Sequence, residues 1–350
     1  MSLGRSFAGH SLPLKLQLAA RYGFEGIEIF YEDLIDYSKT LSGNDVASGS
    51  DQLYAARSIR RLCKENKLEI ICLQPLMHYE ALLDRAAHNQ KIEDAKQWIQ
   101  LAKELGTDLI LLPSSFLSEE ELGDTDLIIK DMIEIADLGA KKEHSVKFAY
   151  EALCWGRRVD TWEKSWDVVK AVNRPNFGVC LDTFNIAGRI YADPTTPSRR
   201  TPDPETAMAE TLSRLVSKVD VAKVFLLQVA DAEYMQHPLV KGHPFHCSEQ
   251  PPRMSWSRNA RLFYGEEQFG GYLPVQSILA AIIRGLQFEG WISFEVFNRR
   301  MTSNDEGVPE EMAARARLSW HKIVNDLRLE GSEPRQDSKP ESQGVARASL

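Results

Sequence analysis

The chain has 350 residues, 43% of them hydrophobic and 26% charged, and its formal net charge is -8. This composition is typical of a globular protein and excludes a disordered, fibrous or membrane-spanning chain. The acidic balance argues against nucleic acid as the main partner, because binding to a phosphate backbone depends on clustered Lys and Arg. A small molecule is therefore the better expectation for a ligand, and we predict an anionic substrate.

The cysteines and the apolar runs indicate the compartment. Five cysteines lie scattered without a Cys-x-x-Cys spacing, a pattern typical of free thiols in a reducing compartment. No apolar run approaches the roughly 20 residues that cross a bilayer, and the first residues lack the charged-then-apolar order of a secretory signal. We predict a cytoplasmic protein without a membrane partner, and the sequence leaves a homo-oligomer open.

Strands and helices are predicted to alternate along the whole chain. Residues 1–4 look like the last part of a first strand that is cut short, and the acidic residues 31–50, with their Gly and Ser cluster, are predicted as an exposed loop. Residues 229–273 form a long connection. The predicted strands cover residues 1–4, 25–30, 69–73, 108–112, 146–151, 176–182, 222–228 and 291–295. The predicted helices cover residues 13–22, 51–66, 85–105, 125–139, 160–172, 204–219, 274–286 and 309–327.

This order of elements predicts an α/β fold. Strict alternation requires parallel pairing with crossover helices, and eight such units close into a barrel. We predict a (β/α)8 TIM barrel with residues 1–328 as a single catalytic domain and residues 329–350 as a disordered tail, because residues 331–342 lack large apolar side chains. The usual nucleotide-binding glycine motifs are absent from the sequence.

Four consecutive strands end on an oxygen-bearing side chain, namely Glu151, Asp182, Gln228 and Glu295. Because the active site of such a barrel lies at the C-terminal ends of the strands, these side chains should point toward one opening. Three carboxylates that converge there would repel one another without a cation. We predict a shared metal ion, and hard oxygen ligands favour Mg2+ or Mn2+, with Co2+ as a further option. The competing interpretation is that each acid caps the next helix or pairs with an arginine.

The connection at residues 229–273 carries a second polar cluster. Arg258 and Arg261 could form a fork for a substrate carboxylate, with Ser257 adding a hydroxyl, because a guanidinium matches a carboxylate in two parallel hydrogen bonds. The alternative is a surface loop whose arginines are solvated or form structural ion pairs.

Further candidates lie in or just before the loops that follow the strands. His78 could serve as a catalytic base, although a lone histidine in a loop is more often only hydrogen-bonded. Asn185 could orient a ligand or the substrate but cannot act as a base. Trp155, four residues past Glu151, is placed to line the pocket. Glu151 and Glu295 are themselves candidates for moving a proton.

In these segments the sequence resembles the 3-dehydroshikimate dehydratases, particularly the fungal enzymes of quinate catabolism, within the sugar phosphate isomerase/epimerase-like TIM barrel superfamily. The similarity covers nearly the whole chain to about residue 327, and the order and spacing of the segments together are highly specific. The segments are Gly-Ile-Glu-Ile-Phe at 26–30, Leu-Gln-Pro at 73–75, Tyr-Glu-Ala-Leu-Cys-Trp-Gly at 150–156, Val-Asp-Thr-Trp at 159–162, Leu-Asp-Thr-Phe-Asn at 181–185, Gln-Val-Ala-Asp-Ala at 228–232, Ser-Trp-Ser-Arg at 255–258 and Phe-Glu-Val-Phe-Asn at 294–298.

The resemblance implies a divalent metal on the four strand-end side chains, with glutamine where many superfamily relatives carry histidine, and substrate contacts on the serine and two arginines of the second cluster. It implies dehydration of 3-dehydroshikimate to protocatechuate, in which the metal stabilises an enolate formed when a base removes a proton. Bacterial relatives tend to show histidine where this chain has Asn185 and Asn259. The base therefore stays open among His78, a metal-bound water and the ligand carboxylates.

Other functions stay open at this point. A ketose or sugar phosphate isomerase or epimerase of the same superfamily would use Glu151 and Glu295 to shuttle a proton. A non-catalytic regulatory relative would follow if the shortened first strand left a folded but inactive protein. A metal-dependent endonuclease of this superfamily fits poorly, because the chain is acidic and has 8 histidines.

Overall fold

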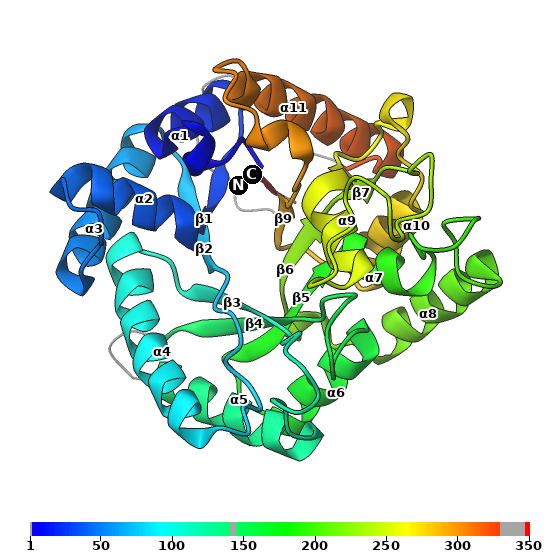
Figure 1. Cartoon of the computed structure of the whole chain (residues 1–350), viewed down its shortest axis with the longest axis horizontal. Helices are drawn as coiled ribbons and strands as arrows, with labels where there is room; N and C mark the ends of the chain where they lie inside the picture. The colour runs from blue at the N-terminus through cyan, green and yellow to red at the C-terminus, as the bar shows by residue number, and fades with distance from the viewer. Residues whose placement is uncertain (1, 141–144, 330–346) are drawn as a thin grey trace.

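The structure is a closed barrel of parallel strands inside a ring of helices. The computed structural model describes residues 2–140, 145–329 and 347–350. In barrel order the strands run β1-β10-β9-β6-β5-β4-β3-β2, and every neighbouring pair is parallel. Figure 1 looks down the barrel and shows the helices surrounding the strands. The predicted TIM barrel is confirmed.

The described residues contain eleven α-helices and ten strands, eight of which form the barrel. The strands are β1 Gly26–Phe30, β2 Glu69–Gln74, β3 Leu109–Pro113, β4 Lys147–Glu151, β5 Phe177–Asp182, β6 Val224–Val229, β7 Asp231–Ala232, β8 Arg261–Leu262, β9 Trp291–Phe294 and β10 Arg347–Ser349. The helices are α1 Leu12–Arg21, α2 Tyr31–Ser42, α3 Gly49–Glu65, α4 Arg85–Leu105, α5 Thr125–Gly139, α6 Trp162–Val172, α7 Thr183–Ile190, α8 Pro204–Lys218, α9 Pro252–Ala260, α10 Val275–Ala280 and α11 Val308–Leu327.

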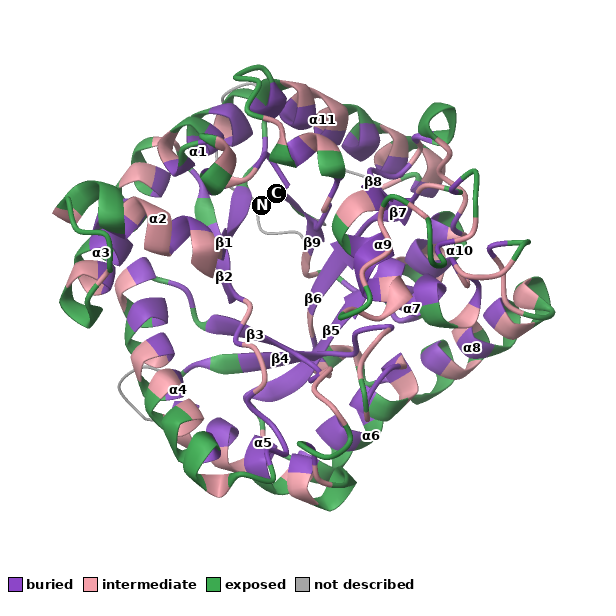
Figure 2. Cartoon of the chain, in the orientation of Figure 1, coloured by how far each residue is buried: buried purple, intermediate pink, exposed green. Residues whose placement is uncertain are grey.

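The core lies between the barrel and the helices. β3 and β5 are buried along their whole length, as expected for parallel strands that helices cover. Each long helix turns one apolar stripe inward, and on α4 the buried positions Ala95, Trp98, Leu101, Ala102 and Leu105 recur at helical spacing. Figure 2 shows buried strands at the centre and exposed positions on the outer helix faces. None of the described helices combines the length and apolar character needed to span a bilayer.

The first strand predicted at residues 1–4 is wrong. Ser2 and Leu3 lie in a turn, residue 1 lies outside the described residues, and β10 fills the barrel position between β1 and β9. Ser2 lies at the C-terminal end of β9, where its Oγ donates to the Phe294 carbonyl at 2.8 Å and accepts from the Val296 N–H at 3.0 Å. Figure 1 accordingly shows the two ends of the chain side by side.

β10 is hydrogen-bonded to its neighbour β1. The Leu350 N–H donates to the Gly26 carbonyl at 3.3 Å, and the Leu350 carbonyl accepts from the Glu28 N–H at 3.0 Å. Ser349 pairs in register with Gly26 on one side and with Ser293 on the other. The disorder predicted for residues 329–350 therefore does not hold for residues 347–350, whereas residues 330–346 lie outside the described part. That residues 1–328 form one catalytic domain stays a prediction.

The exposed loop predicted at residues 31–50 is wrong in its first part, because α2 occupies it. Glu32 and Asp33 lie in its first turn and Lys39 in its last turn, where these charges suit the helix dipole. Gly43, with a φ of 72°, ends the helix in the left-handed conformation. The acidic residues that suggested a loop thus mark a helix N-terminus.

The predicted long connection at residues 229–273 also contains regular structure. β7 pairs antiparallel with β8, and α9 comes directly before β8 in the chain. The short helix α7, which the sequence did not indicate, follows β5 without a loop. Both α7 and β7 come just after the C-terminal ends of barrel strands, where the site is predicted.

Candidate metal centre and active site

Four adjacent strands bring the predicted ligands to one end of the barrel. Glu151 and Asp182 are the last residues of β4 and β5, Gln228 lies one residue before the end of β6, and Glu295 directly follows β9. These strands are neighbours in the barrel, and Asp182 and Gln228 are partners in the register of β5 and β6. The side chains singled out from sequence therefore lie together.

Three carboxylates form a compact buried cluster at this end. One oxygen each of Glu151, Asp182 and Glu295 lies within 4.8 Å of the others, and none of the three residues is more than 6% exposed. Burial raises the pKa of Glu151 well above its ordinary value, and repulsion by Glu295 and Asp182 adds to the effect. Burial also raises the pKa of Glu295, although Arg261 opposes it. Such a cluster needs positive charge to stay ionised.

Arg261 supplies one positive charge within the cluster. Its Nη1 donates to Asp182 Oδ2 at 2.7 Å and to Glu295 Oε2 at 3.0 Å, and the residue is only 1% exposed. The guanidinium carbon lies 4.2 Å from the ring centroid of Phe184 and 5.2 Å from that of Phe297. Arg261 therefore pairs with two of the predicted metal ligands, and its contact with a substrate stays a prediction.

Two local interactions hold Asp182 and Glu151 in place. Asp182 Oδ1 accepts from the Asn185 N–H at 3.0 Å and so caps α7. Asn185 Nδ2 donates to Glu151 Oε1 at 2.7 Å, and its Oδ1 accepts from the Cys154 N–H at 3.0 Å. Asp182 therefore caps α7 and pairs with Arg261, and it also belongs to the carboxylate cluster. Asn185 is thus hydrogen-bonded to one carboxylate of the cluster, and its role toward the substrate stays a prediction.

A fourth buried acid, Glu28 in β1, was missed by the sequence analysis. Glu28 is 7% exposed and accepts hydrogen bonds from Gln228 Nε2 at 3.2 and 3.0 Å and from Gln74 Nε2 at 2.7 Å. Burial raises its pKa. A signal was present in the sequence, since a glutamate between two isoleucines of a short buried strand needs a polar partner inside the barrel.

The serine and the remaining arginine of the second cluster lie on α9. Ser257 is buried, and its Oγ accepts from Arg261 Nε at 3.0 Å. Arg258 is exposed and forms no ion pair with any residue that the structure describes. Partial desolvation of its guanidinium and repulsion by Arg5 lower its pKa. Arg258 thus offers a free cation for an anionic ligand.

The described contacts of His78 and Trp155 are with residues outside the carboxylate cluster. His78 Nδ1 lies 2.9 Å from Ser115 Oγ, and its ring packs edge-on against Phe116 with centroids 4.5 Å apart. Burial, assisted by a nearby lysine, lowers the pKa of His78 to about 4, so its imidazole is neutral at pH 7. Trp155 lines a surface pocket together with Arg253.

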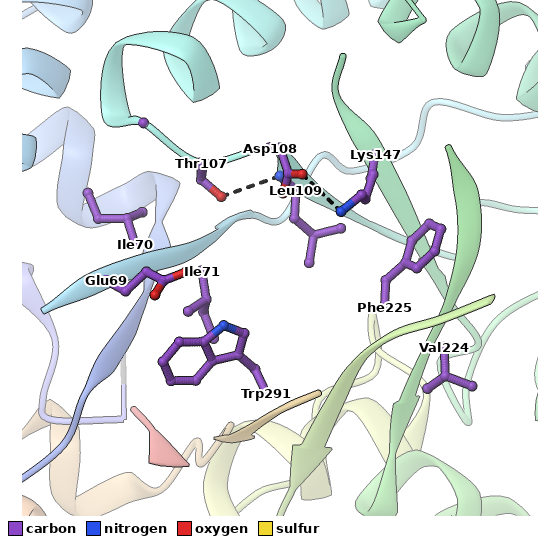
Figure 3. Close-up of a pocket in the computed structure, with 11 residues that line it drawn as sticks. Glu69, Ile70, Ile71, Thr107, Asp108, Leu109, Lys147, Val224, Phe225 and Trp291 are labelled. Carbon is purple, nitrogen blue, oxygen red and sulfur yellow. Dashed lines mark hydrogen bonds and ion pairs between the residues drawn. The ribbon is translucent and has the colours of Figure 1, made fainter. Parts of the chain in front are cut away.

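Two further features of the molecule do not offer comparable chemistry. The pocket in Figure 3 is lined by residues at the start of strands, at the opposite mouth of the barrel, where Lys147 pairs with Asp108 at 2.9 Å. In TIM barrels that end serves stability rather than catalysis. A second group of potential metal ligands, which includes Asp131 and His88, is already satisfied because Arg85 donates two hydrogen bonds to Asp131 at 3.0 and 2.7 Å.

Known proteins are similar to this chain in sequence and in fold. Residues 16–322 match the family described as xylose isomerase-like TIM barrel. The chain belongs to this family. It is 53% identical over 334 residues to the 3-dehydroshikimate dehydratase of Neurospora crassa, a match that covers 94% of this chain and 93% of that protein. The resemblance inferred from the sequence motifs is confirmed.

The match to more distant relatives covers less than half of those longer proteins. The chain is 31% identical over 288 residues to the 3-dehydroshikimate dehydratase of Pseudomonas aeruginosa, which covers 82% of this chain and 36% of that protein. A solved xylose isomerase-like TIM barrel/4-hydroxyphenylpyruvate dioxygenase fusion protein superposes with a TM-score of 0.69 at 25% identity, over 93% of this chain and 42% of that chain.

Proposed function

We propose that the chain is a hydro-lyase that dehydrates 3-dehydroshikimate to protocatechuate with a divalent metal. The observation that carries the proposal is the buried cluster of Glu151, Asp182 and Glu295 at the end of the barrel where enzymes of this fold hold their active sites. The 53% identity to the Neurospora crassa dehydratase, over almost the full length of both chains, supports the same reaction.

The donor set suits a divalent cation. Three carboxylates against the single guanidinium of Arg261 leave an excess of two negative charges when all are ionised. Oxygen donors without histidine or cysteine favour Mg2+, Mn2+ or Co2+ over Zn2+. In this proposal the three carboxylates hold the ion and the Gln228 amide oxygen is the fourth ligand. A bound cation of this kind acts as a Lewis acid toward the substrate ketone and its neighbouring hydroxyl.

Residues around the cluster position the substrate. Arg258 carries a charge that no described acid neutralises, so it suits the substrate carboxylate, with Ser257 and Arg261 as further contacts. Asn185 keeps Glu151 in one orientation through its 2.7 Å hydrogen bond. Burial of the cluster keeps bulk water away, which strengthens each electrostatic contact with a bound substrate. Trp155 is proposed to line the approach to the site.

The reaction breaks one C–H and one C–O bond and releases water. Tautomerisation then moves a second ring proton to the ketone oxygen, which leaves an aromatic ring. A base takes the proton that the conjugated ketone makes acidic, and the hydroxyl leaves after it accepts a proton. We assign the proton transfers to Glu151 and Glu295, because both lie in the cluster that would face the substrate. His78, neutral at pH 7, is the alternative base, and His78→Gln separates the two assignments because it abolishes turnover only if the imidazole moves the proton.

A direct assay tests the proposal. Metal-loaded protein mixed with 3-dehydroshikimate should produce the ultraviolet absorbance of an aromatic product, and metal-stripped protein should not. No absorbance change with any of Mg2+, Mn2+ or Co2+ would rule the proposal out. Conversion of a ketose or sugar phosphate in its place would favour an isomerase or epimerase.

The cysteines bear on the compartment in which the protein works. All five cysteines are free and four are buried, as expected for a protein of a reducing compartment. The cytoplasmic location and a homo-oligomer both stay predictions.

A further inference from the structure

We infer that the Ser2 hydroxyl fixes the position of Glu295 in the metal site by holding the backbone on both sides of it. Ser2 is then a positioning residue that acts through Glu295 and need not touch the metal. The inference rests on the metal site proposed above and adds to it a residue from the opposite end of the sequence.

Glu295 lies where the barrel ladder ends on one side of its strand. β9 ends at Phe294, and its register with β10 ends at the pair of Ser293 and Ser349. On the other side of the strand the Glu295 N–H still donates to a carbonyl of β6 at 3.3 Å. The Phe294 carbonyl and the Val296 N–H therefore lie beyond the last residue pair of the ladder between β9 and β10.

Ser2 Oγ bonds to both of these backbone groups. It donates to the Phe294 carbonyl at 2.8 Å and accepts from the Val296 N–H at 3.0 Å, and Ser2 is only 6% exposed. A hydroxyl suits this place because the same oxygen donates one hydrogen bond and accepts others. Loss of the hydroxyl would leave a buried carbonyl and a buried N–H unpaired, and the backbone around Glu295 can regain partners only by moving.

A second buried hydroxyl holds another ligand-bearing segment in the same way. Thr183 Oγ1 donates to the Ala230 carbonyl at 2.8 Å and accepts from the Ala230 N–H at 3.0 Å, two residues past Gln228. Ser2 differs from Thr183 because its two contacts lie on either side of a predicted ligand. Loss of the Ser2 hydroxyl should therefore reach the metal more directly.

Arg261 links the backbone of Glu295 to the carboxylate cluster. Its Nη1 donates to the Glu295 carbonyl and to Glu295 Oε2, each at 3.0 Å, and the same nitrogen lies 2.7 Å from Asp182 Oδ2. A shift of the backbone at Glu295 therefore changes the spacing between Glu295 and Asp182. The affinity for an ion that both carboxylates hold depends on this spacing.

A double-mutant cycle on Mn2+ binding tests the inference without substrate or turnover. The Mn2+ dissociation constant is measured from the electron paramagnetic resonance signal of the free ion for the wild type, Ser2→Ala, Glu295→Gln and the double variant. Ser2→Ala should raise this constant about tenfold, as for other residues that hold a metal ligand in place. In the Glu295→Gln background the same change should cost less than about threefold, because the residue through which Ser2 acts is no longer a charged ligand.

Controls separate this result from loss of the fold and from failure of the proposed function. Ser2→Thr keeps the hydroxyl and should bind Mn2+ within about threefold of the wild type. Thr211→Val removes another buried hydroxyl, which donates to Glu163 Oε1 at 2.8 Å and accepts from Trp162 Nε1 at 2.9 Å, and should lower the melting temperature without changing Mn2+ affinity.

Each contrary result has its own meaning. Wild type that does not bind Mn2+ would overturn the metal site itself. Unchanged affinity in Ser2→Ala, a loss of the same size in Ser2→Thr or Thr211→Val, or an equal loss in both backgrounds of the cycle would overturn the role of Ser2 and leave the metal site standing.

Discussion

Replacing Arg261 by methionine should destabilise the protein strongly at neutral pH. The side chain is 1% exposed and its Nη1 lies 2.7 Å from Asp182 and 3.0 Å from Glu295. Methionine fills much of the same volume but leaves these carboxylates and Glu151 without their positive neighbour. Breaking a buried ion pair by removal of one partner typically costs about 3 to 5 kcal/mol, and we expect the free energy of unfolding to fall by that amount.

Urea denaturation in the presence of a chelator measures this loss. The loss should shrink between pH 8 and pH 6, because burial raises the pKa of Glu151 and of Glu295 and protonation then removes the repulsion. Arg200→Met is a matched control, since Arg200 pairs with Glu205 on the surface at 2.7 Å and should contribute less than about 1 kcal/mol. If Arg261→Met unfolds within about 1 kcal/mol of the wild type at pH 8, the cluster is not held together by this arginine.

Other parts of the molecule give equally definite expectations. Burial raises the pKa of Asp231 from 3.8 to about 7, so the native state holds more protons than the unfolded state over this interval and stability falls as the pH rises through it. Asp231→Asn keeps the oxygen for its backbone hydrogen bonds and should flatten that fall in urea denaturation; an unchanged slope would refute the shift. Leu350→Ala should cost about 2 to 4 kcal/mol, because Leu350 is 4% exposed and packs in the core cluster, and an unchanged unfolding midpoint would show that β10 does not close the barrel in solution. Arg258→Met should raise the KM for 3-dehydroshikimate about tenfold or more with little change in melting temperature, whereas a loss of kcat at constant KM would contradict carboxylate binding.

The parts of the fold that the sequence predicts well are those with local signals. The helix at residues 85–105 matches α4 in both bounds, because its apolar positions recur at helical spacing and Gly106 ends it with a φ of 85°. The strand ends at Glu151 and Asp182 are equally local, since each short apolar run stops on an acid. The barrel rule then places these ends together without any structural information.

The parts that the sequence does not predict depend on distant contacts. β10 has three residues, and both strands that pair with it lie far away in the chain, so no local pattern marks it. Arg261 resembles Arg258 in sequence, yet one is buried among carboxylates and the other is exposed, a difference that only packing decides. Glu28 was overlooked because its partners, Gln74 and Gln228, come from two other strands.

The most direct test of the central claim is metal-dependent turnover by the wild type beside Glu151→Gln and Glu295→Gln. Each protein is stripped with a chelator, reloaded with Mg2+, Mn2+ or Co2+, and mixed with 3-dehydroshikimate while the ultraviolet absorbance is recorded. The wild type should regain activity with at least one of these ions, and both variants should lose at least about a hundredfold in kcat/KM, because each removes a charged ligand from the cluster. Full activity in both variants, or activity in the stripped wild type, would contradict a metal centre on these carboxylates.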